Sequence, residues 1–414
     1  MIFSIVNLGC KVNRVESDDA AAKLLSKGWE QGGAEAAHLI IVNTCAVTGE
    51  AEKKTRKAVR QALRSSESAR VVVTGCASAL RPEAFEEMSD RVECVAKGDL
   101  AAWLDKLPGH DDAVAHGPVL RVGAPFPTRV GVKVQDGCDN ACTYCIVHVA
   151  RGRAVSRPVD EVVAECVAYA RAGVGEIVLT GINLGSYGRR VAQGPAVGLA
   201  DLLKELLSRT ETLRAEDGPP CRFRISSIEP KDVDAGLIDL ISRAEGRVCR
   251  HLHLPLQSGS SKVLREMARP YDAGFFADLV SDLRAAVPQL SLSTDIIAGF
   301  PGESEADFEE TLSVARACGF SRIHAFPYSP RRGTPAAERA DQLPPEVKEA
   351  RAARLRTLGG ELRDGDFSRR VGTRELVLVE QDGRGMSESY YEVPVPADAE
   401  PGRLIEVPLA RKLD

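Results

Sequence analysis

Three cysteines lie within a stretch of eight residues, at the spacing C-x3-C-x2-C: Cys138, Cys142 and Cys145. Thiolates are soft ligands that select zinc, copper(I) or iron–sulfur clusters. A closed zinc site needs a fourth ligand, and only His148, three residues further on, offers one nearby, so zinc is the alternative. An iron–sulfur cluster with only three protein thiolates has one iron open to bind a small molecule. The spacing therefore predicts a cluster that takes part in chemistry.

Three more cysteines each follow a predicted strand. Short apolar runs alternate with amphipathic stretches, which is the pattern of a parallel sheet flanked by helices. The predicted strands are Ile2 to Asn7, Leu39 to Asn43 and Val71 to Thr74. Cys10, Cys45 and Cys76 come directly after them. Ligands bind at the carboxyl ends of the strands in such a sheet, so the three thiols are expected to converge on a second metal site.

Beyond residue 130, six repeats of strand and helix predict a partial (β/α)6 barrel with its functional groups at the carboxyl ends of the strands. The chain is therefore predicted to be α/β. An Arg-rich helix follows the barrel, and short β runs separated by Gly and Pro end the chain. These runs predict a small five-stranded β-barrel, an architecture often used to bind nucleic acids.

These patterns divide the chain into five predicted segments. They are an amino-terminal α/β domain (1–106), a linker rich in Gly, Pro, Asp and His (107–129), the partial barrel (130–343), a connecting helix (344–371) and the β domain (372–414).

Composition agrees with a cytosolic protein. Of 414 residues, 27% are charged, no apolar run approaches the roughly 18 residues of a membrane span, and the first residues lack the features of a signal peptide. Cytosolic cysteines stay reduced, so the eleven in this chain favour metal binding over disulfides. The net charge of −5 gives no overall nucleic-acid signature, and a local basic patch must supply any phosphate contact.

One such patch is a predicted helix after Cys45, which is either a solvated face or a phosphate-binding surface. Its basic residues are Lys53, Lys54, Arg56, Lys57, Arg60 and Arg64. The remaining cysteines are expected to be core or bystander residues, and they are Cys94, Cys166, Cys221, Cys249 and Cys318.

The first cysteine motif, with Tyr144 as its aromatic residue, resembles the signature of the radical S-adenosylmethionine (SAM) superfamily. The sequence motifs GCKVN, NTCAVT and TGC, which contain Cys10, Cys45 and Cys76, resemble the amino-terminal domain of the methylthiotransferases. This resemblance implies a three-quarter barrel, two 4Fe-4S clusters on the two cysteine sets, SAM as cofactor and a TRAM-like RNA-binding β domain. It also implies a group of residues on the barrel rim that bind SAM or substrate, namely Tyr144, Asn183, Ser227, Glu229, Gln257 and Asp295.

Within this family, the motifs GCKVN and NTCAVT most resemble those of the class that adds a 2-methylthio group to N6-threonylcarbamoyladenosine beside the tRNA anticodon. The implied partners are the tRNA anticodon arm, an electron donor and a sulfur source, with no membrane. The alternatives are the isopentenyladenosine or ribosomal-protein classes, a different radical SAM enzyme, and a zinc-containing RNA-binding protein. Where relatives have Pro-Tyr after the third thiol, this chain has His148-Val149.

Overall fold

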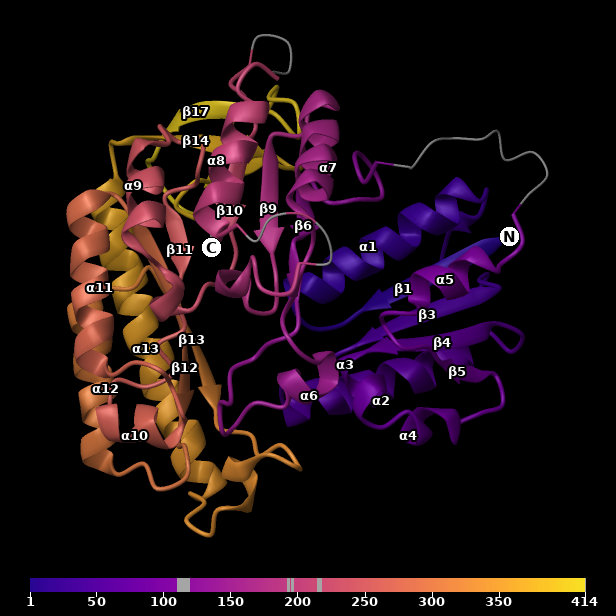
Figure 1. The fold of residues 1–414 in the computed structure, drawn as a ribbon, viewed down its shortest axis with the longest axis horizontal. Helices are drawn as coiled ribbons and strands as arrows, with labels where there is room; N and C mark the ends of the chain where they lie inside the picture. Colours follow the sequence, from indigo (N-terminus) through magenta and orange to yellow (C-terminus); the bar gives the residue numbers. More distant parts are fainter. Residues whose placement is uncertain (110–119, 192–193, 195–196, 214–217, 414) are drawn as a thin grey trace. The chain divides into compact units, whose positions relative to one another are not determined.

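The computed structural model describes residues 1–109, 120–191, 194, 197–213 and 218–413 (Figure 1). The chain divides into two compact units. The amino-terminal unit comprises Met1–Pro127, Gly137–Asp139 and Cys145–Arg153, and the barrel unit comprises Thr128–Asp136, Asn140–Tyr144 and Ala154–Asp414. Part of the predicted linker, 110–119, lies outside the described residues.

The described part of the amino-terminal unit contains one sheet of five parallel strands, in the order β2-β1-β3-β4-β5. The strands are β1 (Ile2–Asn7), β2 (Glu30–Gln31), β3 (Leu39–Thr44), β4 (Arg70–Gly75) and β5 (Val92–Cys94). The three strands predicted from the sequence are confirmed as β1, β3 and β4, which are neighbours in the sheet.

Helices cover both faces of this sheet, as Figure 1 shows. On one face, α1 (Lys11–Ser26) and α5 (Leu100–Asp105) form a core with β1 and β3 around Phe3, Leu24 and Ile41. The other face is covered by α2 (Gly49–Ser65), α3 (Cys76–Leu80), α4 (Glu83–Glu86) and α6 (Val147–Arg151). Both faces are buried, which explains why β3 and β4 read as nearly continuous apolar runs.

The described residues of the barrel unit include the six predicted parallel strands, which confirms the partial (β/α)6 barrel. They are β6 (Arg129–Lys133), β9 (Glu176–Thr180), β10 (Arg222–Ile225), β11 (His251–His253), β12 (Ser291–Ala298) and β13 (Arg322–Pro327). Two sheets, β10-β9-β6 and β11-β12-β13, are joined by isolated parallel bridges between Phe223 and Val248 and between Ser227 and His253. A short antiparallel pair, β7 (Gln135–Asp136) and β8 (Val155–Ser156), follows β6 along the chain.

The helices of the barrel unit pack on the outer face of these strands. They are α7 (Val159–Arg171), α8 (Leu199–Arg209), α9 (Ala235–Arg243), α10 (Ser261–Glu266), α11 (Ala273–Ala286), α12 (Glu305–Cys318) and α13 (Pro345–Arg370), with 3-10 turns η1 (Leu184–Ser186), η2 (Pro230–Asp232) and η3 (Pro335–Glu338). Because strand side chains alternate, Leu292 and Ile296 of β12 join the apolar core while Ser293 and Asp295 face the other way.

The chain ends in an antiparallel sheet of four strands within the described residues, in the order β16-β15-β14-β17. The strands are β14 (Arg374–Val379), β15 (Arg384–Ser387), β16 (Glu392–Pro394) and β17 (Leu404–Pro408). The expected antiparallel β domain is therefore present, but its sheet has four strands rather than the five-stranded barrel predicted from the sequence.

A buried ionic cluster joins this sheet to the barrel. Arg222 and Arg224 of β10 donate to both carboxylate oxygens of Glu176 on β9 at 2.7 Å, and all three side chains are almost fully buried. The two guanidinium groups also donate to the backbone carbonyls of Met386 and Glu388, at 2.9 and 3.0 Å. Burial alone would raise the pKa of Glu176, but Arg224 and Arg222 hold it well below its usual value.

None of the described helices is long and apolar enough to cross a membrane. Four of the five cysteines outside the two sets are buried as predicted, namely Cys166, Cys221, Cys249 and Cys318. Cys94, at the end of β5, is only half-buried, and its thiol donates to the carbonyl of Pro82 at 3.5 Å.

Candidate functional site

Cys10, Cys45 and Cys76 lie at one edge of the sheet of the amino-terminal unit. Cys45 and Cys76 come directly after β3 and β4, and Cys10 follows β1 after a short turn. The three strands are neighbours and parallel, with Asn7, Asn43 and Thr74 in register at their ends. The sheet therefore presents three thiols at its carboxyl edge, as expected from the sequence.

Gly9 and Asn13 set the local geometry of this edge. Gly9 has a φ of +100°, and a Cβ atom there would lie 2.7 Å from the Cβ of Cys45 and 2.9 Å from its Sγ. Only glycine leaves room for the Cys45 thiol and adopts this φ without strain. Asn13, at the start of α1, donates to the carbonyls of Leu8 and Thr44 at 2.8 Å each, which ties together the turns after β1 and β3.

A buried arginine lies against this thiol set. The Nε of Arg151, at the end of α6, is 3.2 Å from the Sγ of Cys76. Its guanidinium also donates to both carboxylate oxygens of Glu16 at 3.0 Å and to Oδ1 of Asn13 at 2.7 Å. The sequence gives Arg151 no role, because nothing in its neighbourhood along the chain shows that it reaches a cysteine 75 residues away.

Burial raises the pKa of both the Cys45 and Cys76 thiols, while Arg151 opposes the shift at Cys76. Buried thiolates need a compensating positive charge, which metal coordination supplies directly. Three converging thiols, two of them buried beside a cation, fit an iron–sulfur cluster.

The loop of Cys138, Cys142 and Cys145 is shaped by glycines. Gly137 has a φ of +74°, and a Cβ atom at this residue would lie 2.0 Å from the carbonyl oxygen of Arg153. The close approach lets the backbone amide of Cys138 donate to the carbonyl of Gly152 at 3.0 Å. Cys138 and Cys145 belong to the amino-terminal unit, and the amide of Val147 donates to the Sγ of Cys145 at 3.4 Å.

Cys142 belongs to the barrel unit, where a second buried arginine contacts it. Nη1 of Arg269 is 3.1 Å from the Sγ of Cys142, and Nη2 forms an ion pair with Glu229. Arg269 also donates to the hydroxyl groups of Tyr144, at 3.4 Å, and Tyr271, at 2.9 Å. Burial raises the pKa of Glu229, and Arg269 lowers it. Sequence analysis missed Arg269 for the same reason as Arg151.

The structure gathers some of the predicted rim residues and separates others. Tyr144 and Glu229 meet on Arg269, beside Cys142. The backbone amide of Gln257 donates to the carbonyl of Asp295 at 2.8 Å, so these two residues are also neighbours.

The other two predicted rim residues are held by backbone contacts. The backbone amide of Asn183 donates to the side-chain oxygen of Gln135 at 2.9 Å. Ser227 forms an isolated parallel β-bridge with His253, whose side chain contacts Asp295, so Ser227 is near the second pair. Assignment of the rim residues to SAM stays a prediction.

Comparison with known proteins agrees with these features. The Radical SAM superfamily matches residues 132–315, and the uncharacterized protein family UPF0004 matches residues 3–97. A threonylcarbamoyladenosine tRNA methylthiotransferase, MtaB, from Chlamydia pneumoniae is 35% identical over 95% of this chain and 91% of its own length. The chain belongs to the radical SAM methylthiotransferase family. Another methylthiotransferase of this family, a tRNA-2-methylthio-N(6)-dimethylallyladenosine synthase from Moorella thermoacetica, is 34% identical over 99% of this chain and 96% of its own length.

Solved structures share the fold at low identity. The radical SAM methyltransferase TsrM from Kitasatospora setae has a TM-score of 0.55 and 15% identity, covering 81% of this chain and 74% of its own. Radical SAM methylthiotransferases use SAM and two 4Fe-4S clusters. The donor sets of this chain, with six cysteines in two groups and a buried arginine at each, fit this requirement.

Proposed function

We propose that this enzyme replaces the C2 hydrogen of N6-threonylcarbamoyladenosine in tRNA with a methylthio group. The proposal is carried by five bacterial relatives named for this activity, which are 31 to 36% identical over 86 to 95% of the chain. The dimethylallyladenosine class is the second candidate, because its Moorella thermoacetica member is nearly as similar.

In this proposal, Cys138, Cys142 and Cys145 hold the cluster that binds SAM, and Cys10, Cys45 and Cys76 hold the auxiliary cluster. When bound, these groups supply the electron that cleaves SAM and the sulfur of the product. Arg269 keeps the Glu229 carboxylate and the Tyr144 hydroxyl in place beside Cys142, and Arg151 keeps Cys76 beside a fixed positive charge.

The tRNA needs cationic contacts that an acidic protein must supply locally. On α2, five exposed basic side chains have no ion-pair partner among the described residues, and they are Lys53, Lys54, Lys57, Arg60 and Arg64. We assign the anticodon arm to this helix face. A reductant and a sulfur source complete the reaction, and a tRNA substrate implies a cytosolic enzyme.

The test is anaerobic reconstitution with iron and sulfide, followed by mass spectrometry of nucleosides from treated tRNA. We expect about eight irons per chain and formation of the 2-methylthio nucleoside. Single replacements C138A, C142A or C145A should abolish SAM cleavage, because two thiolates do not hold the cluster with its open iron in place.

The triple variant C10A/C45A/C76A is the matched control. It should keep about four irons and tRNA-independent SAM cleavage while it loses the methylthio product. Normal methylthiolation by this triple variant would refute the assignment of the auxiliary cluster. A wild-type enzyme that modifies only dimethylallyladenosine would favour the second candidate.

A further inference from the structure

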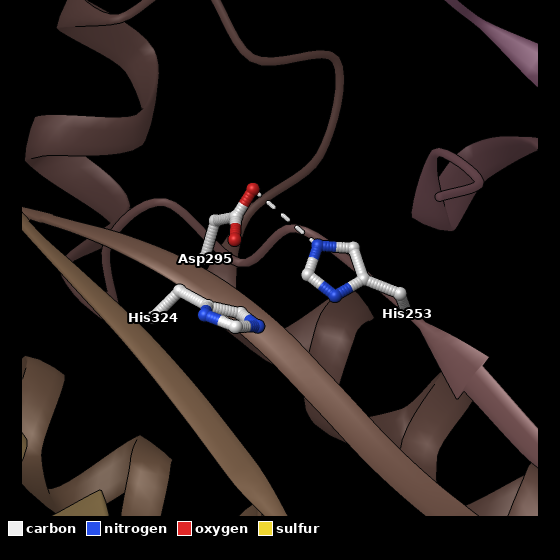
Figure 2. Close-up of side chains that lie close together, drawn as sticks. All are labelled: His253, Asp295 and His324. Carbon is white, nitrogen blue, oxygen red and sulfur yellow. Dashed lines mark ion pairs between the residues drawn. The ribbon is translucent and has the colours of Figure 1, made fainter. Parts of the chain in front are cut away.

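Three ionisable side chains on neighbouring strands of the barrel lie close together: His253 on β11, Asp295 on β12 and His324 on β13 (Figure 2). Each offers one polar atom within 4.8 Å of the others. Nε2 of His253 is 3.3 Å from Oδ2 of Asp295, and the centroids of the two imidazole rings are 5.8 Å apart. We call these three residues the His-Asp-His group.

Strand register places the group on one face. Asp295 pairs directly with His324, and His253 pairs with Ser293, two residues before Asp295. Because side chains alternate along a strand, all of these residues point away from the helix-covered face, where Leu252, Leu292 and Ile296 form the core. The group therefore lies on the inner face of the barrel.

A hydrogen bond to Ser293 fixes the orientation of the His253 ring. Its Nδ1 is 2.9 Å from Oγ of Ser293, which is also 2.9 Å from Nε2 of His251. This arrangement directs Nε2 of His253 toward Asp295. The side chains remain partly open, since 14% of His253 and 31% of Asp295 are exposed. A partly open group with fixed orientation is suited to binding a polar ligand.

We propose that the His-Asp-His group binds the threonylcarbamoyl substituent of the substrate adenosine. This inference rests on the proposed function. In adenine, C2 and the carbon that carries N6 flank the same ring nitrogen, so the substituent on N6 lies next to the reacting carbon. A recognition site for it must therefore belong to the barrel unit, near the carboxyl ends of the strands where chemistry is expected.

The chemistry of the two partners is complementary. The substituent carries a carboxylate, a hydroxyl and ureido N–H groups. The imidazole of His324 can donate a hydrogen bond to its carboxylate, and Asp295, held in place by His253, can accept from its hydroxyl or N–H groups. A dimethylallyl substituent offers none of these atoms and could not form hydrogen bonds with the group. A site built for hydrogen bonds rejects an apolar analogue strongly, so this group would determine substrate class.

The test compares H324F with wild type on two substrates: tRNA that carries threonylcarbamoyladenosine, and the same tRNA without the threonylcarbamoyl group. Removing one hydrogen bond to a charged ligand should lower kcat/KM for the modified tRNA by roughly 10- to 100-fold, mainly through KM. Activity on the unmodified tRNA should change little, so the preference ratio, kcat/KM for the modified tRNA divided by kcat/KM for the unmodified tRNA, falls.

The second variant, H324N, keeps a side-chain donor and should retain an intermediate preference ratio. The control is R322Q, on the same face of β13, and it should retain the wild-type ratio.

Two results would overturn the inference alone: H324F with the wild-type preference ratio, or wild-type protein that binds stoichiometric zinc or manganese which H324F loses. Two histidines and a carboxylate also suit a divalent cation, so the metal content is measured directly. If wild-type enzyme methylthiolates neither tRNA, the proposed function fails, and this inference fails with it.

Discussion

Each set of cysteines has one buried arginine that also pairs with a glutamate. Arg151 joins Cys76 to Glu16, and Arg269 joins Cys142 to Glu229. A buried cation without a counter-ion would be costly, so the glutamate allows each guanidinium to remain beside its thiol. The arginine in turn offsets negative charge on the thiolates. Both arginines are therefore expected to position the thiols and to stabilise their ionised state.

Replacing Arg269 tests this interpretation at a single residue. In R269Q, Glu229 loses the cation that opposes burial, so its pKa rises further above its usual value. A carboxyl group with a raised folded-state pKa destabilises the protein at pH values above that pKa, and protonation relieves the cost as pH falls. We expect R269Q to lose about 3–5 kcal/mol at neutral pH and clearly less in mild acid, measured by urea unfolding.

The double variant R269Q/E229Q is the control, since it removes the carboxylate together with its partner. It should recover much of the stability lost at neutral pH. An equal loss for R269Q at both pH values, with no recovery in the double variant, would show that Arg269 acts through packing alone.

At the scale of helices and strands, the periodicity of apolar residues and the length of each apolar run made most of the fold predictable. The strands β1, β3 and β4 begin and end within one residue of the bounds predicted from the apolar runs. The strand β15 was missed because its residues, Arg384 to Ser387, show no alternation of apolar and polar types. Arg151, Arg269 and His324 were missed because their roles depend on contacts with residues distant in sequence.

The conformation of the Cys138 loop depends more on Gly137 than on Gly152. The two alanine variants, G137A and G152A, form a matched pair that tests this difference. Gly137 and Gly152 both have a φ of +74°, but a Cβ atom would meet the Arg153 carbonyl at Gly137 and nothing within 4 Å at Gly152. Both alanine variants carry backbone strain of roughly 1–3 kcal/mol at a positive φ, and only G137A must also displace the loop. After reconstitution, G137A should retain about four fewer irons than wild type, while G152A keeps nearly all. Equal iron contents would contradict this role.

At the scale of the whole molecule, the arginines of the Arg-rich helix α13 make contacts within the barrel unit. Six arginines of α13 have partners among the described residues, and they are Arg351, Arg354, Arg356, Arg363, Arg369 and Arg370. Two of them, Arg351 and Arg370, are buried. By contrast, five basic side chains of α2 are exposed and have no ion-pair partner among the described residues. These five side chains are therefore the cationic face that we assign to tRNA.

The carboxyl-terminal sheet belongs to the same compact unit as the barrel. Removal of residues 371–414 would take away the backbone carbonyls that accept from Arg222 and Arg224, and would expose these side chains with Glu176. Breaking a buried charged network costs several kcal/mol. We therefore expect truncation after Arg370 to lower Tm and to reduce SAM cleavage even without tRNA.

Replacing Lys53, Lys54 and Lys57 by Ala should weaken tRNA binding without lowering Tm or SAM cleavage. These exposed side chains on α2 support no described contact, so Tm and tRNA-independent SAM cleavage should stay at wild-type values. Each lost phosphate contact should flatten the log–log dependence of tRNA affinity on salt by roughly 0.7 to 0.9. The triple lysine variant and the protein truncated after Arg370 would each be compared with wild type by thermal unfolding and by tRNA titration at several salt concentrations. A truncated protein with wild-type Tm that loses only tRNA affinity would show that the terminal sheet is a separate RNA-binding domain after all.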